Sequence, residues 1–300
     1  MIPTTYDGLL ILDKPPGMTS RAALDRAARW FPRRTRIGHT GTLDPLASGV
    51  LVLCLGSATR LTEYVQNMSK TYLSRFLLGA RSDTDDADGI ITPTISAVAP
   101  APSLVAAHVA QFVGTIEQVP PAFSAAKVTG RRAYDLARRG EVVELAPRLV
   151  RVDAINILLY DFPVLDVEVH CGKGTYIRSL ARDLGDRLGC GAHVQDLRRT
   201  RVGPFTAENA HTLECDPAAA RARLLPMQLA VAELPRTTLS LDDAKRFCQG
   251  QAIVLPELSP GANGGKIAVF DNEQRLLAVA EYDVQAQVLR PAKVLASRER

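Results

Sequence analysis

The sequence reads GHTGTLDPLASG over residues 38–49 and then turns apolar from Val50 to Leu55. The apolar run predicts a buried strand, and the glycines of the preceding loop would let a backbone or a ligand approach closely. Asp44 is the only carboxylate of this loop, and Pro45 restricts it to extended backbone geometry. We therefore expect the loop to present one carboxylate beside the start of a core strand.

Two uses of Asp44 are open at this point. A lone aspartate in electropositive surroundings should stay ionised, which suits a nucleophile or a base rather than an acid. The alternative is an Asx turn, in which the carboxylate only caps its own loop. Because Asp-Pro turns are common, this residue taken alone favours the turn.

The rest of the chain mixes strands and helices. The segment Val164–Cys171 alternates apolar and polar residues strictly, which is typical of a half-buried strand. Apolar residues follow at helical intervals from Ile177, and Gly189 ends that helix. Further strands are expected at Gly8–Leu12 and Lys70–Leu78, and further helices from Thr19 or Ser20 and over Ser103–Phe112. Without regular βαβ alternation, this order favours an α+β fold with a mixed, mainly antiparallel central sheet flanked by helices and loops.

A chain of 300 residues is long enough for two domains. From Pro235 onward, strand-like runs alternate with Gly- and Pro-containing turns and predict a small all-β unit. These runs are Lys266–Phe270, Leu276–Ala280 and Gln287–Leu289. We expect residues 1–232 to form the main domain and residues 233–300 a β-rich C-terminal domain.

The composition, 46% hydrophobic and 23% charged, is that of a globular chain. Its apolar runs are far shorter than the roughly 18 residues that span a bilayer, and no secretory signal is expected at the N-terminus. The five cysteines are scattered and form no Cys-x-x-Cys pair, which indicates reduced thiols and excludes a tetrahedral zinc site. We expect a cytoplasmic protein with no membrane partner and no metal.

The positive charge is concentrated in three segments, although the formal net charge is only +4. Residues 21–37, 127–151 and 173–201 together hold 20 Lys or Arg and 7 Asp or Glu. If these segments converge in space, they form the basic surface that a phosphate-bearing polymer requires. Solvated arginine-rich helix faces are the alternative, so charge alone favours nucleic-acid binding only slightly.

Several familiar motifs are incomplete. Residues 172–175 (GKGT) look like part of a phosphate loop, but the first glycine that such a loop requires before the lysine is absent. The carboxylates of residues 83–89 mimic a calcium loop, but Thr84 and Ile95 stand at its first and last ligand positions. No Gly-x-Ser-x-Gly elbow and no complete dinucleotide fingerprint occur.

Three longer runs carry a resemblance to a known family. Residues 8–20 (GLLILDKPPGMTS), 38–49 and 174–180 (GTYIRSL) closely resemble the bacterial tRNA pseudouridine-55 synthases of the B type. Shorter matches are KTY at 70–72, DTD at 83–85 with DG at 88–89, PAFSAAK at 121–127, GCGAH at 189–193 and LRR at 197–199. The matches keep their order over residues 8–205, whereas the C-terminal 70 residues resemble the family's RNA-binding module less clearly.

The resemblance implies an enzyme that isomerises uridine 55 in the T-loop of tRNA to pseudouridine by base flipping, without metal or cofactor. Asp44 matches the catalytic aspartate, which would attack the ribose C1′ or the uracil C6, or act as a base on a glycal route. Tyr72 matches the tyrosine that stacks on the flipped uracil, and Arg178 the arginine that pairs with the catalytic carboxylate. Tyr176 and Leu197 match positions that line the uracil pocket.

Further expectations follow from the resemblance. His39 matches a histidine that helps hold the flipped loop, and Lys14 is expected to support the catalytic loop. The insertion at about 118–151 would be a thumb that closes on the RNA, and residues 233–300 a PUA-like RNA-binding domain. We expect a monomer whose partner is the T-arm of tRNA.

Other classes of function stay open beside the isomerase. An RNA-binding protein on the same scaffold could assist tRNA folding, with Asp44 in a structural role. A carboxylate-dependent glycosidase is disfavoured because no second carboxylate lies near Asp44 in the sequence, although a distant one could meet it in space.

Overall fold

The computed structural model describes residues 6–95, 98–124, 127–128, 131–134, 139, 145–256 and 265–295. The strands are β1 (Gly8–Lys14), β2 (Ile37–His39), β3 (Ser48–Leu55), β4 (Lys70–Leu78), β5 (Ala80–Ser82), β6 (Ile91–Pro93), β7 (Gly114–Gln118), β8 (Lys127–Val128), β9 (Arg131–Arg132), β10 (Arg148–Asp161), β11 (Val164–Cys171), β12 (Ala192–Val202), β13 (Phe205–Thr206), β14 (Arg236–Thr238), β15 (Ile253–Val254), β16 (Lys266–Phe270), β17 (Leu276–Asp283) and β18 (Val288–Val294). The helices are α1 (Ser20–Ala28), α2 (Thr62–Asn67), α3 (Pro102–Ala110), α5 (Ile177–Arg187), α6 (Pro217–Ala222) and α7 (Leu241–Cys248), with the 3₁₀ helices η1 (Gly56–Leu61), η2 (Ala207–Asn209) and η3 (Met227–Val231).

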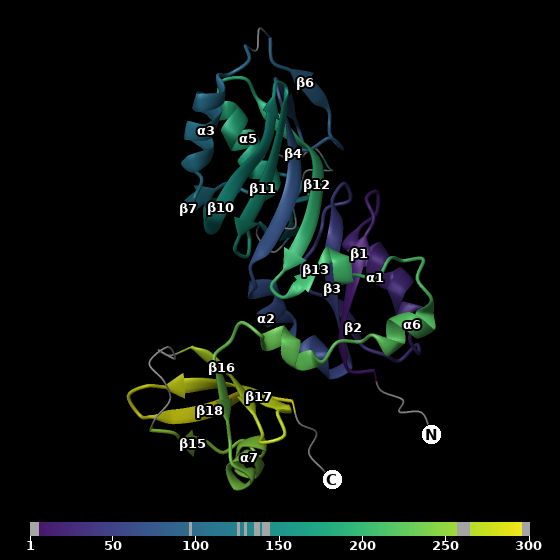
Figure 1. The fold of residues 1–300 in the computed structure, drawn as a ribbon, viewed down its shortest axis with the longest axis vertical. Coiled ribbons are helices and arrows are strands. Elements are labelled where there is room, and N and C mark those ends of the chain that lie inside the picture. Colours follow the sequence, from purple (N-terminus) through teal and green to yellow (C-terminus); the bar gives the residue numbers. More distant parts are fainter. Residues whose placement is uncertain are drawn as a thin grey trace.

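A central sheet runs through most of the chain in the order β1-β3-β12-β4-β11-β10-β7 (Figure 1). β2 pairs with β3, and β13 pairs with β12. Neighbouring strands are antiparallel except for β3 and β12, which run parallel where Ser48 and Gly49 face Arg198 and Arg199. This short parallel contact joins the N-terminal strands to the long antiparallel strands, and the end of the 38–49 loop lies directly at it.

Gly49 makes this junction sterically possible. Its φ is +101°, and a Cβ at this position would lie 2.1 Å from the carbonyl oxygen of Arg199. No side-chain-bearing residue fits there without moving one of the two strands. The glycine pattern of the loop therefore sets the close approach of β3 and β12.

Helices cover one face of the sheet's longer strands. The alternation predicted for residues 164–171 is that of β11, whose Leu165, Val167 and Val169 are fully buried. They share one core cluster with apolar residues of α3 and α5. The other half of the sheet is covered on both faces: Leu10 and Leu12 of β1 belong to the same core as α1, whereas Leu9 and Ile11 belong to a second cluster with α2 and η3.

The C-terminal residues form a second sheet in the order β14-β16-β17-β18-β15, with α7 packed on it (Figure 1). This sheet is attached to the main part through apolar residues of η1, α2, β16 and β17 that share one cluster. Lys293 Nζ also lies 2.6 Å from a carboxylate oxygen of Glu63. The predicted α+β class, with its mainly antiparallel central sheet and β-rich C-terminal part, is confirmed.

Element bounds differ from the expectations in detail. The expected helix over 103–112 is α3, from Pro102 to Ala110, and the helix expected to end at Gly189 is α5, whose last residue is Arg187. The long strand β10 was not predicted, because its polar residues do not alternate cleanly. Of the expected thumb at 118–151, Gln118 ends β7, β8 pairs with β9, and residues 148–151 begin β10. Residues 125–126, 129–130, 135–138 and 140–144 of this segment lie outside the described residues.

In the described part of the chain, no helix combines the length and apolar character needed to cross a bilayer.

Candidate active site

A cavity of about 270 Å³ lies beside β4 and β12. Residues of four segments line it: the 40–44 loop, the start of β4 with Gln66 before it, the turn into α5, and the middle of β12. The lining residues are Thr40, Gly41, Thr42, Leu43, Asp44, Gln66, Lys70, Tyr72, Gly172, Lys173, Gly174, Thr175, Tyr176, Ile177, Arg178, Leu197 and Arg199. Five of the seven residues singled out in the sequence are therefore brought to one cavity: Asp44, Tyr72, Tyr176, Arg178 and Leu197.

Asp44 is paired with the buried Arg178. Nη2 of Arg178 lies 2.9 Å from Oδ2 of Asp44, and Nη1 of the same guanidinium lies 3.1 Å from Oδ2 of Asp86. The guanidinium also donates to the backbone carbonyls of Thr84 and Phe123 at 2.9 and 3.0 Å. A planar guanidinium with four acceptors has a fixed orientation. Arg178 therefore holds Asp44 in place at the cavity wall.

The pKa of Asp44 is not shifted in the direction that electropositive surroundings alone would give. Burial raises the pKa of Asp44 above its usual value, and Asp86 adds to this, whereas Arg178 and Lys14 oppose it. The expected electropositive surroundings are present but are outweighed by desolvation. A desolvated carboxylate is a stronger base and nucleophile once ionised, so its reactivity is increased at the cost of a narrower pH range.

Asp86 is the carboxylate that the sequence did not single out. It is buried, and its Oδ1 accepts hydrogen bonds from Thr84 Oγ1 at 2.6 Å and from the Asp88 backbone N–H at 3.2 Å. The Val194 N–H of β12 donates to the Asp85 carbonyl at 3.0 Å and so fixes this turn beside the sheet. The acidic turn is thus a support for Arg178 and not a cation loop.

Lys14 supports the loop that carries Asp44. Its side chain is fully buried, and Nζ donates to the carbonyls of Pro15, Met18 and Pro45 at 2.9, 2.7 and 3.4 Å. Ser20 adds two hydrogen bonds to Leu43, accepting from its N–H at 2.7 Å and donating to its carbonyl at 3.0 Å. The residues on either side of Asp44 are therefore tied to the segment that links β1 to α1.

Replacement of Lys14 by methionine should change how stability depends on pH. Burial lowers the pKa of Lys14 from 10.5 to about 8 in the folded chain. Between these values the unfolded chain holds a proton that the folded chain has lost, so the Lys14 contribution to the free energy of unfolding rises with pH. The difference in unfolding free energy between wild type and Lys14→Met should increase by up to about 3 kcal/mol from pH 7.5 to 10.5. Urea titrations across this range measure it, and a constant difference would contradict the prediction.

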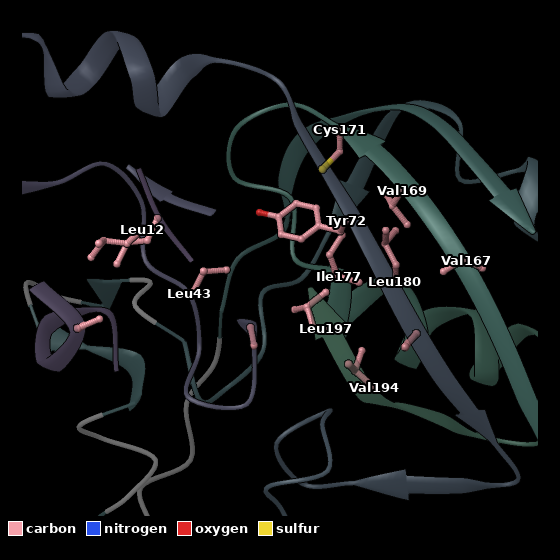
Figure 2. Close-up of a cluster of buried hydrophobic side chains, with 14 of the residues drawn as sticks. Leu12, Leu43, Tyr72, Val167, Val169, Cys171, Ile177, Leu180, Val194 and Leu197 are labelled. Carbon is pink, nitrogen blue, oxygen red and sulfur yellow. The ribbon is translucent and has the colours of Figure 1, made fainter. Parts of the chain in front are cut away.

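Tyr72 and Leu197 form an apolar wall. Figure 2 shows the Tyr72 ring next to Ile177 and above Leu197, with its hydroxyl pointing away from β4 to the side on which Leu43 and Leu12 lie. Tyr72 and Arg199 lie directly opposite each other on β4 and β12. Burial raises the pKa of the Tyr72 phenol, and the Arg199 guanidinium opposes this.

Tyr176 lies immediately before α5. No side chain of its own caps the helix; instead, Gln118 of β7 accepts from the Tyr176 N–H at 2.7 Å and donates to the Tyr176 carbonyl at 3.0 Å. Ser179 Oγ donates to the Val119 carbonyl at 2.8 Å and fixes the first turn further. These contacts set the position of Arg178, the second residue of the helix.

His39 lies next to the cavity but does not line it. It is half-buried at the end of β2, opposite Leu53 of β3. Burial lowers its pKa, and the cations Arg199 and Arg21 add to this. Its Nδ1 has no hydrogen-bond partner in the described part of the chain.

The sequence reasoning also missed Lys70 and Arg199, which are buried cavity-lining cations. Arg199 Nε donates to the Val50 carbonyl at 2.7 Å, and Nη2 to the Gly41 carbonyl at 3.2 Å. Both residues lie in short matches, at 70–72 and 197–199, so the signal was present. Among the described residues, no three His, Cys, Asp or Glu side chains are grouped as metal ligands.

Two solved structures share this fold over nearly the whole chain. One chain in the crystal structure of a Cbf5-Nop10-Gar1 complex aligns with a TM-score of 0.76 and 25% identity, covering 98% of this chain and 86% of that chain. A chain of the archaeal box H/ACA sRNP Nop10-Cbf5 complex aligns with a TM-score of 0.75 and 26% identity, covering 99% of this chain and 88% of that chain.

Sequence comparison then gives the family. The model of the TruB family pseudouridylate synthase N-terminal domain matches residues 29–177, and that of the tRNA pseudouridylate synthase B C-terminal domain matches residues 178–232. The tRNA pseudouridine synthase B of Burkholderia mallei is 44% identical over 281 residues, covering 91% of this chain and 92% of the relative. The protein of the same name from Cupriavidus metallidurans is 44% identical over 298 residues, covering 96% and 94%. The chain belongs to the TruB family of pseudouridylate synthases, and it is an isomerase.

Proposed function

We propose that this enzyme converts uridine 55 in the T-loop of tRNA to pseudouridine, with the uridine everted into the cavity beside Asp44. The observation that carries the proposal is the contact of 2.9 Å between Asp44 and the buried Arg178 in a cavity walled by Tyr72. A base in a folded loop must leave its stack before its glycosidic bond can be reached, at a cost of a few kcal/mol. Stacking on an aromatic ring offsets part of that cost.

The cavity divides these tasks among its residues. Tyr72, Leu197 and Tyr176 would line the pocket that holds the uracil ring. Asp44 would react with the everted nucleotide at C1′ or at C6, or would act as a base, and Arg178 would keep the carboxylate aimed at it. Lys14 would fix the loop, and His39 would contact the RNA beside the cavity entrance.

The glycosidase alternative is not supported by this geometry. A second carboxylate, Asp86, does meet Asp44 in space through the shared Arg178, but it is not among the residues that line the cavity. Hydrolysis by two carboxylates requires both of them to face the scissile bond. Asp86 is therefore suited to orient Arg178 and not to act on the sugar.

The wider arrangement supports binding of the T-arm. The basic segment 173–201 supplies cavity-lining residues, and Arg21 of the segment 21–37 is close enough to lower the pKa of His39. A-form RNA is recognised mainly through phosphates and shape, which suits arginine-rich segments around a cavity. We keep residues 1–232 as the catalytic domain, the thumb at about 118–151, residues 233–300 as the RNA-binding domain, the monomeric state and the cytoplasmic location as parts of the proposal.

The direct test uses an unmodified tRNA transcript. The protein is incubated with the transcript, and pseudouridine is mapped at nucleotide resolution for wild type and for Asp44→Ala. Wild type should modify position 55, and Asp44→Ala should leave it as uridine. Modification elsewhere in the transcript, or none by wild type, would reject the proposed substrate site.

A further inference from the structure

Three cationic residues of the cavity have no part in the mechanism described above. Lys70 is the first residue of β4 and lies on the same face of the strand as Tyr72. Its strand neighbour on β11 is Cys171, and Lys173 follows two residues later. Arg199 of β12 lies opposite Tyr72. We call Lys70, Lys173 and Arg199 the basic wall, because all three line the cavity beside Tyr72.

The basic wall is not neutralised by carboxylates. Lys70 Nζ donates to the carbonyls of Gln66 and Met68, Lys173 Nζ donates to Asn67 Oδ1 at 3.0 Å, and Arg199 donates to two backbone carbonyls. Within the described residues, none of the three forms an ion pair. Among the described residues, Asp44 is the only acidic residue that lines the cavity, and its carboxylate is paired with Arg178.

Burial makes the positive charges of Lys70 and Arg199 energetically unfavourable. Lys70 and Arg199 are 8% and 3% exposed. The pKa of Lys70 is lowered to about 8, mainly by desolvation and also by the neighbouring cations Arg199 and Lys173, while Cys171 and Glu233 offset only part of the shift. A buried cation without a counter-charge is unfavourable, and an anion that enters the cavity would relieve it.

The turn at residues 172–176, which lines the cavity just before α5, leaves room for such an anion. Gly174 has a φ of +88°, and apart from its chain neighbours no heavy atom of the described residues lies within 4 Å of the position that a Cβ would take. This is the GKGT segment that lacks the first glycine of a nucleoside-triphosphate loop. A single phosphate group is therefore the better match for it.

We propose that the basic wall binds one backbone phosphodiester of the RNA, next to the nucleotide that stacks on Tyr72. This rests on the proposed function, because an everted nucleotide brings its flanking phosphates with it. The phosphate would fix the ribose relative to Asp44, so the basic wall positions the substrate and does not take part in the bond changes.

The test measures coupling between one phosphate and one lysine. T-arm stem-loop RNAs are made with a neutral methylphosphonate in place of one loop phosphate at a time, and their affinities are measured with Asp44→Asn protein so that no RNA is converted. Lys173→Met and Lys70→Met are added to this background. Arg75→Met is the matched control, since Arg75 pairs with Asp166 outside the cavity.

One methylphosphonate flanking the target uridine should weaken binding by about tenfold, the effect of losing a hydrogen bond to a charged group. The same replacement should have almost no effect on Lys173→Met or Lys70→Met, and its full effect on Arg75→Met. The slope of log affinity against log salt should fall by about 0.7 in each lysine variant. If Lys70→Met fails to fold, the exposed Lys173→Met alone carries the test.

Equal losses in wild type and in the lysine variants at every loop phosphate would overturn the phosphate site. Failure of the Asp44→Asn protein to bind any T-arm RNA is a different outcome and would overturn the proposed function itself.

Discussion

Asp44→Asn is expected to abolish pseudouridine formation while tRNA affinity stays close to that of wild type. Asparagine keeps the shape of the side chain and can still contact Arg178, but it is neither a nucleophile nor a base. The rate should therefore fall by at least about four orders of magnitude, as when an enzyme loses the group that reacts. Binding is spread over many phosphate and stacking contacts, so it should survive.

Single-turnover rates and filter-binding affinities measure the two effects separately. Asp166→Asn is the control, because Asp166 also pairs with an arginine, Arg75, but lies outside the cavity. Measurable turnover by the Asp44→Asn protein would contradict the role of Asp44 as the reacting group. The same variant also separates isomerisation from tRNA folding assistance, which would persist without the carboxylate if it is a property of binding alone.

The reaction rate should also fall as the pH is lowered, because Asp44 must be ionised to react. Burial raises the pKa of Asp44, and the reactive form is the ionised one. The fraction ionised falls as pH drops through the raised pKa, so the acid limb of the profile of kcat/KM should lie above the roughly 3.9 of a free aspartate. A limb at the ordinary value would mean that Arg178 cancels the effect of burial.

Local pattern predicted the elements on which the site depends. The alternation over 164–171 gives β11 its exact bounds, and the spacing from Ile177 onward predicts the helix that carries Arg178. The glycines around Asp44 indicated a close approach, and Gly49 makes it, against the backbone of Arg199. These features are encoded within about ten residues of chain, which is why sequence reasoning could reach them.

Asp86 and Lys70 show what local pattern cannot supply. The acidic turn holding Asp86 resembles any solvated turn until the hydrogen bond between Val194 and Asp85 places it beside β12, more than one hundred residues away in the chain. Lys70 begins a strand, where a lysine is ordinarily solvated, and only the carbonyls of Gln66 and Met68 explain its burial. The role of Asp86 arises from a tertiary neighbour, whereas the ammonium of Lys70 is satisfied by local carbonyls, and only its place in the cavity depends on distant segments.

Arg178→Met is expected to damage stability and activity together, but for separable reasons. The substitution leaves two carboxylates and two backbone carbonyls without their common donor. An uncompensated buried charge costs about 3–5 kcal/mol, so the free energy of unfolding should fall by that amount. The pKa of Asp44 should rise further, because the guanidinium that opposes burial is gone. Chemical denaturation and single-turnover rates over a range of pH measure both.

A second substitution in the same protein distinguishes the two effects. In Arg178→Met/Asp86→Asn, one of the stranded charges is removed, and part of the lost stability should return. Activity should not return, since no guanidinium pairs with the Asp44 carboxylate or holds it in its reactive orientation. Arg178→Lys keeps the charge but not the planar fork, so it should keep more stability than activity. If activity recovered along with stability in the double variant, Arg178 would be only a structural support of the fold, and its place beside the reacting carboxylate would have no catalytic consequence.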